Sequence, residues 1–85
     1  MNFVSLVGKL HGPKKGTYRY IEVSRPYIDG TAENLEIPCQ YWTHDEHNLF
    51  MSVKEGAMLV IRGRIDMNNA IGMFIIVEQF VLVKE

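Results

Sequence analysis

The sequence predicts an all-β fold: a small five-stranded barrel with one short helix between the third and fourth strands. Five apolar segments rich in β-branched and aromatic residues are separated by turns that contain Gly, Pro or Asn, which is typical of short strands. A helix-start pattern, Thr43-His44-Asp45-Glu46, stands between the third and fourth segments. Gly63 interrupts the fourth segment, and a glycine inside a strand pattern usually marks a bulge or a sharp bend.

The length and composition predict one globular domain over residues 1–85. Hydrophobic residues make up 47% and charged residues 22% of the chain, a balance typical of a packed domain and not of a disordered segment. No apolar run approaches the roughly 20 residues of a membrane helix, so we expect no membrane association. Cys39, the single cysteine, forms no internal disulfide, which fits a reducing, cytoplasmic location.

The first two strands are predicted over residues 3–10 and Tyr18–Val23. In residues 3–10 both alternating sets of side chains include apolar residues, so we expect this strand to be covered on both sides, one of them by another subunit. Residues 12–16 form a loop because of their Gly and Pro content. In the second strand, Ile21 and Val23 share one face and the two tyrosines share the other.

The remaining three strands are predicted over Leu35–Trp42, from about Met58 to Met67, and over Met73–Val83. Pro38 suits an edge or a bulge, because proline donates no hydrogen bond to a neighbouring strand. Residues 68–72 form a compact hairpin connection between the last two strands.

The helix is predicted to start at a capping box formed by Thr43 and Glu46 and to end at Gly56 as a left-handed C-cap. Its expected buried stripe is Leu49, Phe50 and Val53. Three strands, a short helix and two further strands follow the order of the five-stranded oligonucleotide/oligosaccharide-binding (OB) fold. A small SH3-like barrel lacks a helix at this place, so the helix favours the OB fold.

The charged residues are distributed unevenly along the chain, although the net charge is only −1. Residues 9–25 hold five basic residues against one acidic residue, whereas residues 26–85 hold four basic residues against nine acidic ones. A near-neutral total argues against simple nucleic-acid binding. A concentrated cationic face nevertheless attracts phosphate, so the first of these segments is a candidate for an anionic partner.

Four segments resemble the bacterial single-stranded DNA-binding protein family. Its opening strand is similar to Met1-Asn2-x-Val4-x-Leu6-x-Gly8-x-Leu10, and its third strand is similar to Ile37-Pro38-Cys39-Gln40-Tyr41-Trp42. Its K-K-G-x-x-V-x-V-E-G-R-I segment resembles Lys54-Glu55-Gly56-x-x-x-Val60-x-x-Gly63-Arg64-Ile65, which has one extra residue between glycine and valine. The family's final strand resembles the last predicted strand here. The resemblance covers most of the chain, in the right order.

The chain departs from that family at three places. The glycine-rich signals of the family's second strand are replaced by Gly16-Thr17-Tyr18-Arg19-Tyr20, and the hairpin at residues 68–72 is shorter than the family's long arm. The flexible acidic tail of the family has no counterpart before Glu85. A short, tail-less paralogue similar to the primosomal replication proteins fits these differences better than a genome-coating protein.

The resemblance implies sequence-tolerant, non-catalytic binding of single-stranded DNA, or of RNA, in replication, recombination or repair. Such binding needs cations for the phosphates and aromatic rings on which bases stack. The candidate residues are Lys14, Lys15, Tyr18, Arg19, Tyr20, Trp42, Arg62 and Arg64. The two-sided apolar first strand also predicts a homodimer or homotetramer.

Several of these residues have an alternative, structural explanation. Trp42 is either a base platform or a side chain packed against the helix that it precedes. Tyr18 and Tyr20 are either stacking residues or a cross-strand aromatic ladder. Arg62 and Arg64 either contact phosphate or pair with acidic side chains across the sheet. The acidic candidates are Glu36, Asp66 and Glu78.

No pattern in the sequence indicates catalysis or a cofactor. His44 and His47, with Asp45 and Glu46 between them, have a spacing that permits metal binding on a helix. No further Cys or His cluster accompanies them, and the capping box already explains Glu46. Cys39 is expected to be a small core residue, because it lies on the apolar side of its strand. We therefore expect neither an enzyme nor a metal site.

A second hypothesis is an OB-fold protein–protein adaptor or replication accessory without strong nucleic-acid binding. The net acidic charge favours it, and a fold does not fix a function. Salt-sensitive binding of a short oligonucleotide separates the two hypotheses, because phosphate contacts weaken as salt rises.

Overall fold

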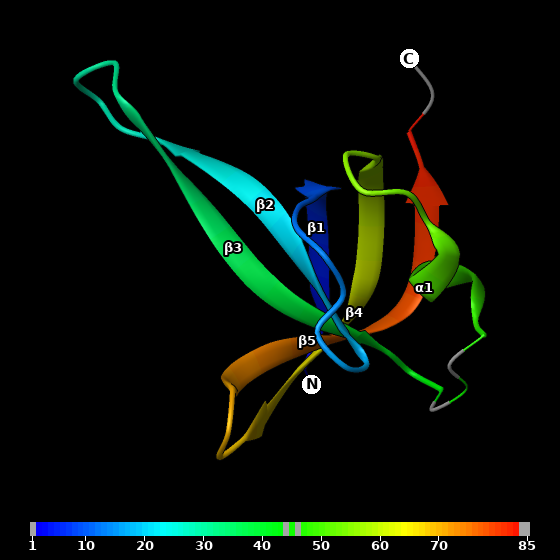
Figure 1. Ribbon diagram of the computed structural model, residues 1–85. Helices are drawn as coiled ribbons and strands as arrows, with labels where there is room; N and C mark the ends of the chain where they lie inside the picture. Colours follow the sequence, from blue (N-terminus) through cyan, green and yellow to red (C-terminus); the bar gives the residue numbers. More distant parts are fainter. Residues whose placement is uncertain (1, 44, 46, 84–85) are drawn as a thin grey trace.

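The computed structural model describes residues 2–43, 45 and 47–83 and shows a closed five-stranded barrel with one short helix (Figure 1). The elements are β1 (Val4–Leu10), β2 (Tyr18–Pro26), β3 (Ala32–Tyr41), α1 (Leu49–Ser52), β4 (Met58–Asn68) and β5 (Gly72–Leu82). The strands follow the order β1-β2-β3-β5-β4, and β4 pairs back onto β1. Among the strand pairs of the described residues, β3 with β5 is the parallel one and the others are antiparallel. The predicted all-β OB fold, with its helix between the third and fourth strands, is confirmed.

β2 and β3 extend from the barrel as a long paired arm (Figure 1). Their pairing continues out to Pro26 and Ala32, beyond the strand ends that the sequence predicted. Near the tip, Arg25 and Glu33 form an ion pair of 2.9 Å across the arm, and the Tyr27 hydroxyl hydrogen-bonds to both side chains. These cross-strand contacts continue the two strands past the barrel.

The barrel interior is filled by apolar side chains from the strands and the helix. The buried core consists of Leu10, Ile21, Cys39, Phe50, Met51, Leu59, Ile61, Ile75 and Val77. Cys39 lies in this core, as predicted, and burial raises the pKa of its thiol to about 12. Phe50 is fully buried, so the short helix is held to the barrel by side-chain packing and not by its own length.

The helix begins later than the sequence predicted. Its N-cap is Asn48, whose side-chain oxygen accepts a hydrogen bond from the Met51 backbone at 2.9 Å, so Thr43 does not cap it. Glu46, the other half of the expected capping box, lies outside the described residues. Leu49 was expected to be buried and is 74% exposed, because a helix that starts there turns the next two residues toward the barrel. In the described part of the chain, no helix is long and apolar enough to cross a membrane.

Gly56 does not end the helix. The C-cap is Val53, which has extended backbone, whereas Gly56 stands in the turn of residues 54–57. Its φ of 91° is left-handed, as the sequence predicted, and its backbone N–H donates to the Leu10 carbonyl at 2.8 Å. This glycine therefore ties the turn before β4 to the end of β1.

Candidate nucleic-acid interface

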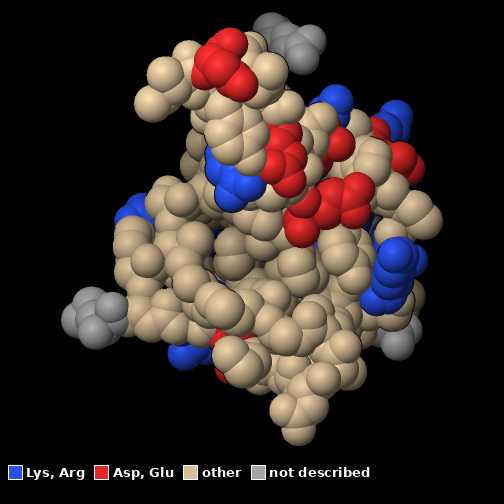
Figure 2. Space-filling view, turned by 90° about the vertical axis from the view of Figure 1, so that its left-hand side faces the viewer, with Lys and Arg blue, Asp and Glu red and all other residues tan. Residues whose placement is uncertain are grey.

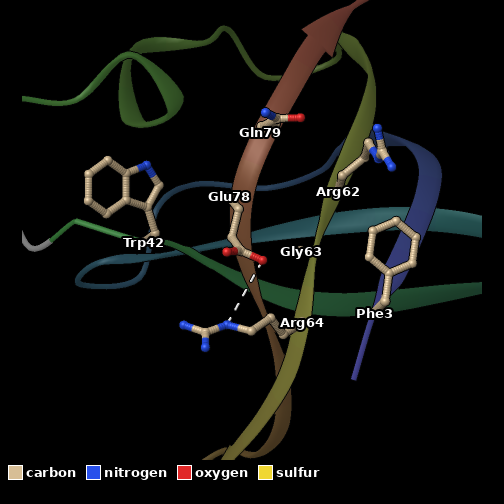
Figure 3. Close-up of a pocket in the computed structure, with 7 residues that line it drawn as sticks. All are labelled: Phe3, Trp42, Arg62, Gly63, Arg64, Glu78 and Gln79. Carbon is tan, nitrogen blue, oxygen red and sulfur yellow. Dashed lines mark ion pairs between the residues drawn. The ribbon is translucent and has the colours of Figure 1, made fainter. Parts of the chain in front are cut away.

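An open groove of about 560 Å³ crosses the outer face of β4 and β5 between two aromatic rings (Figure 3). Trp42, which follows β3, lies on one side of it, and Phe3, which precedes β1, lies on the other. Trp42 is 57% exposed and Phe3 is 61% exposed, so both rings are accessible to a ligand. The other lining residues are Arg62, Gly63, Arg64, Glu78 and Gln79.

The surroundings of Trp42 exclude the alternative in which it packs against the helix. The neighbouring Tyr41 takes that role, because its ring stacks on the Phe50 ring of α1 with centroids 5.9 Å apart. The Trp42 backbone N–H donates to the Val77 carbonyl of β5 at 3.0 Å, which holds the residue beside the groove. An exposed indole on a fixed backbone meets the requirement for a platform on which a base stacks.

A β-bulge shapes the floor of the groove. Arg62 pairs with Gln79 and Gly63 pairs with Val77, so Glu78 is an extra residue in β5 with no partner on β4. A Cβ atom on Gly63 would lie 1.8 Å from the Ile76 carbonyl oxygen, which is far inside van der Waals contact. The two strands therefore approach this closely only with glycine here, and the bulge predicted from Gly63 is confirmed.

Arg62 and Arg64 both reach the groove from β4 (Figure 3). The Arg62 guanidinium lies over the Phe3 ring, 5.1 Å from its centroid. Arg64 approaches Glu78 through its Nε atom at 3.9 Å, and this contact does not involve the two terminal guanidinium nitrogens. Both side chains of that pair are about half exposed, and exposed ion pairs of this kind contribute little to stability. Both arginines thus remain suited to phosphate contacts.

A second group of candidate residues lies on the outer face of β2 and in the loop before it. The Lys15 ammonium lies 5.0 Å from the centroid of the Tyr20 ring, and both residues are accessible to solvent. Two contacts fix the Tyr18 side chain. Its hydroxyl accepts a hydrogen bond from Asn68 at 2.8 Å, and its ring packs edge-on against the Phe74 ring with centroids 5.4 Å apart. Lys14 is exposed in the same loop and lines a smaller pocket.

A row of paired residues connects this second group to the groove. Tyr18 pairs with Gln40, Gln40 with Ile76, and Ile76 with Arg64, in four neighbouring strands. Paired residues project to the same side of a sheet, and adjacent strands lie about 4.8 Å apart, so the row spans about 14 Å. The structure thus places Trp42, Arg62 and Arg64 together, with the tyrosines and the lysine loop further along the same outer face.

Arg19 does not belong to this face, and its predicted role in phosphate binding needs correction. It is 4% exposed, and its guanidinium donates to the backbone carbonyls of Phe50 at 3.0 Å, of Met51 at 3.5 Å and of Val53. Burial lowers the pKa of Arg19, and the charge of Glu55 partly opposes this effect. Arg19 therefore caps the short helix from inside the barrel. Its alternation with Ile21 was a signal for this position.

The basic side chains of residues 9–25 are more dispersed in the structure than their closeness in the sequence indicated. Of its five basic residues, Arg19 is buried and Arg25 is paired with Glu33 on the arm. The Tyr27 hydroxyl and the Glu33 carboxylate raise the pKa of Arg25. Figure 2 shows acidic side chains gathered over the upper part of one face, where the arm projects, and few charges lower down. Lys14 and Lys15 stay exposed, and Lys15 lies over the Tyr20 ring.

The histidine pattern of residues 44–47 and the full lining of the groove are the remaining points of comparison with the sequence. His44 and Glu46 are outside the described residues, and among the residues that are described no three His, Cys, Asp or Glu side chains are grouped to hold a metal ion. Sequence reasoning missed Phe3, Glu78 and Gln79 as lining residues of the groove.

The chain matches no protein-family model and no curated protein by sequence. Its fold is similar to that of the dimeric N-terminal domain of PriB protein from Thermoanaerobacter tencongensis, with a TM-score of 0.64 and 20% identity over 99% of this chain and 98% of that one. It is also similar to Rim1, a mitochondrial single-stranded DNA binding protein from S. cerevisiae, with a TM-score of 0.66 and 16% identity over 98% and 94% of the two chains. The S. pombe Stn1–Ten1 complex contains a chain that aligns with all of this one at 12% identity, over 60% of its own length, with a TM-score of 0.64. At these identities the likeness shows a shared fold.

Proposed function

We propose that this protein binds single-stranded DNA with broad sequence tolerance, without catalysis or a cofactor, in replication, recombination or repair. The observation that carries the proposal is the groove in which two exposed aromatic rings flank two arginines. Aromatic rings stack on any base, and cations neutralise the phosphates between bases. No group in this arrangement needs to recognise one particular sequence.

Each residue of the groove has a distinct part in this binding. Trp42 and Phe3 stack on bases, and a stacked base contributes about 1–3 kcal/mol. Arg62 and Arg64 neutralise phosphates, because guanidinium groups match phosphate oxygens in geometry and charge. Tyr18 lies at the end of the row of paired residues described above, and Tyr20, on the same face, has Lys15 over its ring. These residues, with Lys14, extend the path of the bound DNA beyond the groove.

The comparisons support this proposal through proteins of the same fold. Rim1 is by name a single-stranded DNA binding protein, and its chain aligns with this one over nearly its whole length. The resemblance of four sequence segments to the bacterial single-stranded DNA-binding proteins points the same way. The lone buried Cys39 is consistent with a reducing compartment, so we propose a cytoplasmic location.

Binding is tested with a fluorescently labelled oligo-dT whose anisotropy is followed as protein is added, at low and at moderate salt. The wild-type protein is expected to bind and to weaken as salt rises. The Trp42→Ala variant is expected to bind at least about fivefold more weakly, because it loses a stacking platform. Leu49→Ala is the matched control, because Leu49 is an exposed apolar residue, even more exposed than Trp42, that lies on the helix, outside the groove. Equal affinities of all three proteins would contradict the proposal.

RNA remains a candidate ligand, because the groove contacts proposed here are to bases and phosphates and not to the sugar. Competition between DNA and RNA oligomers of equal length and sequence decides between them. A groove that uses only stacking and charge is expected to bind both. A strong preference for RNA would indicate contacts to the 2′-hydroxyl group.

We also propose a homodimer formed through β1. This strand pairs with β4 along its length, but with β2 only at Lys9 and Leu10, so its edge over residues 4–8 is unpaired on the other side. Val7 on this strand is 56% exposed, and Met58 beside it is 38% exposed. Two copies that pair these edges in antiparallel fashion complete each other's backbone hydrogen bonds and cover the apolar side chains. The PriB domain of the same fold is dimeric.

A protein–protein adaptor is the second candidate, and one observation favours it. An apolar groove lies between the helix and the end of β5, lined by Leu49, Val53, Phe80 and Leu82 among others. Exposed apolar surface of this kind often marks a protein interface. An adaptor is expected to show no salt-sensitive oligonucleotide binding, so the titration above discriminates between the two functions.

A further inference from the structure

Two consecutive residues of β5, Glu78 and Gln79, occupy the floor of the groove between the two aromatic rings (Figure 3). In a regular strand, neighbouring side chains project to opposite faces. Here the bulge opposite Gly63 turns both outward into the groove, while Val77 before them and Phe80 after them pack into or against the core. Bulges re-aim side chains beside binding sites, and this one delivers two hydrogen-bonding groups to the groove.

The two groups differ in what they bind. The Glu78 carboxylate only accepts hydrogen bonds, whereas the Gln79 amide both donates and accepts. The contact between Glu78 and the Arg64 Nε is 3.9 Å long, which is beyond hydrogen-bond distance, and the Glu78 side chain is 50% exposed. Its carboxylate oxygens are therefore accessible to a ligand that enters the groove.

A base that stacks on Trp42 presents its hydrogen-bonding edge to neighbouring groups in the groove. Cytosine offers an amino group at C4, which donates to a carboxylate, and beside it a ring nitrogen, N3, which accepts from an amide. Uracil and thymine carry a carbonyl oxygen at C4, which repels a carboxylate. The Glu78 and Gln79 pair therefore matches the edge of cytosine and mismatches that of uracil or thymine.

We propose, on the basis of the function proposed above, that Glu78 gives this groove a preference for cytosine over uracil and thymine. The preference is modest and is superimposed on sequence-tolerant stacking and phosphate contacts. Glu78 is the discriminating residue, because the amide of Gln79 accommodates either kind of base edge.

The test compares oligo-dC with oligo-dU of equal length, since the two differ only on the base edge that Glu78 would contact. Affinities are measured at one salt concentration and slightly alkaline pH for the wild type, Glu78→Gln and Glu33→Gln. Glu33→Gln is the matched control: Glu33 is 51% exposed, is paired with an arginine and lies outside the groove. Both substitutions remove one negative charge from the surface.

The wild type and Glu33→Gln are expected to bind oligo-dC about fivefold more tightly than oligo-dU. In Glu78→Gln this ratio is expected to fall to about one, because the glutamine amide also donates to the carbonyl of uracil. A ratio that is unchanged in Glu78→Gln overturns the inference, even if both oligomers bind more tightly from the lost charge. Equal wild-type affinities overturn it as well. Absence of salt-sensitive binding to either oligomer overturns the proposed function itself.

Discussion

The guanidinium of Arg62 lies over the ring of Phe3, with its central carbon 5.1 Å from the ring centroid. The two residues come from β4 and from the segment before β1, which are neighbours in the barrel. A cation over an exposed ring contributes about 0.5–1 kcal/mol and limits the motion of both side chains. Phe3 and Arg62 thus form an ordered edge of the groove, opposite Trp42, that joins a stacking surface to a positive charge.

Replacing Phe3 by alanine is expected to weaken oligo-dT binding by about 1–2 kcal/mol, because one of the two stacking rings is lost. The fold is expected to survive, since Phe3 is 61% exposed and lies outside the core. Anisotropy titration measures the affinity, and thermal unfolding checks the stability. Unchanged affinity in a folded variant would remove Phe3 from the interface.

The double variant Arg62→Gln, Arg64→Gln is expected to bind more weakly and with a smaller dependence on salt. For single strands, each phosphate contact contributes about −0.7 to the slope of log affinity against log salt. The slope is therefore expected to become less negative by about 1.4. If the double variant keeps the wild-type slope, the two arginines do not contact phosphate.

Replacing Arg19 by methionine is expected to destabilise the fold and to leave the salt dependence of binding unchanged. The substitution removes the donor for three backbone carbonyls of the helix region, and unsatisfied buried acceptors cost about 1–3 kcal/mol. Arg25→Met is the control, because it breaks an ion pair that is exposed to solvent and is therefore expected to destabilise the fold less than Arg19→Met does. Urea denaturation measures both variants. If Arg19→Met and Arg25→Met lose similar amounts of stability, Arg19 is not a structural link to the helix.

The stability of the protein is expected to fall above pH 9 in a manner that depends on Cys39. Burial raises the pKa of its thiol from the ordinary value of a cysteine to about 12 in the fold. Between these values the unfolded thiol loses its proton while the folded thiol keeps it, so rising pH favours unfolding. Denaturation of Cys39→Ala, which lacks this group, is expected to show a weaker decline. Parallel pH profiles of the two proteins would contradict the burial of an un-ionised thiol.

Substituting arginine for Val7 is expected to convert the proposed dimer into a monomer. The new charge would stand on the open edge of β1 and face the same charge across the two-fold axis of the dimer. Size-exclusion chromatography with light scattering gives the mass of each protein at micromolar concentration. A wild-type protein that is strictly monomeric would contradict the proposed dimer.

The sequence was sufficient to predict the order of strands and helix along the chain and the irregularity at Gly63, because both depend on local patterns. Alternation of apolar residues marked the strands, and Gly63 marked the place where β4 approaches β5 too closely for a side chain. The predicted start of the helix, at Thr43, was wrong. Thr43 and Asn48 are both good N-cap residues, and only the packing of Phe50 and Met51 against the barrel selects Asn48.

The candidate site was predicted in part. Trp42 and the two arginines were identified by residue type and alternation, and the structure places them in one groove. Arg19 was assigned to the surface because charged residues usually lie there, although its alternation with Ile21 placed it inside. Phe3 was missed because its position opposite Trp42 depends on closure of the barrel, which no local pattern encodes.

The fluorescence of Trp42 during an oligo-dT titration tests the central claim most directly. Trp42 is the only tryptophan of the chain, so its signal reports on the groove alone. If bases stack on this ring, its emission falls to a constant, quenched level as oligo-dT is added, and the midpoint of the titration moves to higher oligonucleotide concentration as salt rises. An emission that stays constant up to saturating oligonucleotide at low salt would contradict a single-stranded DNA site between Trp42 and Phe3.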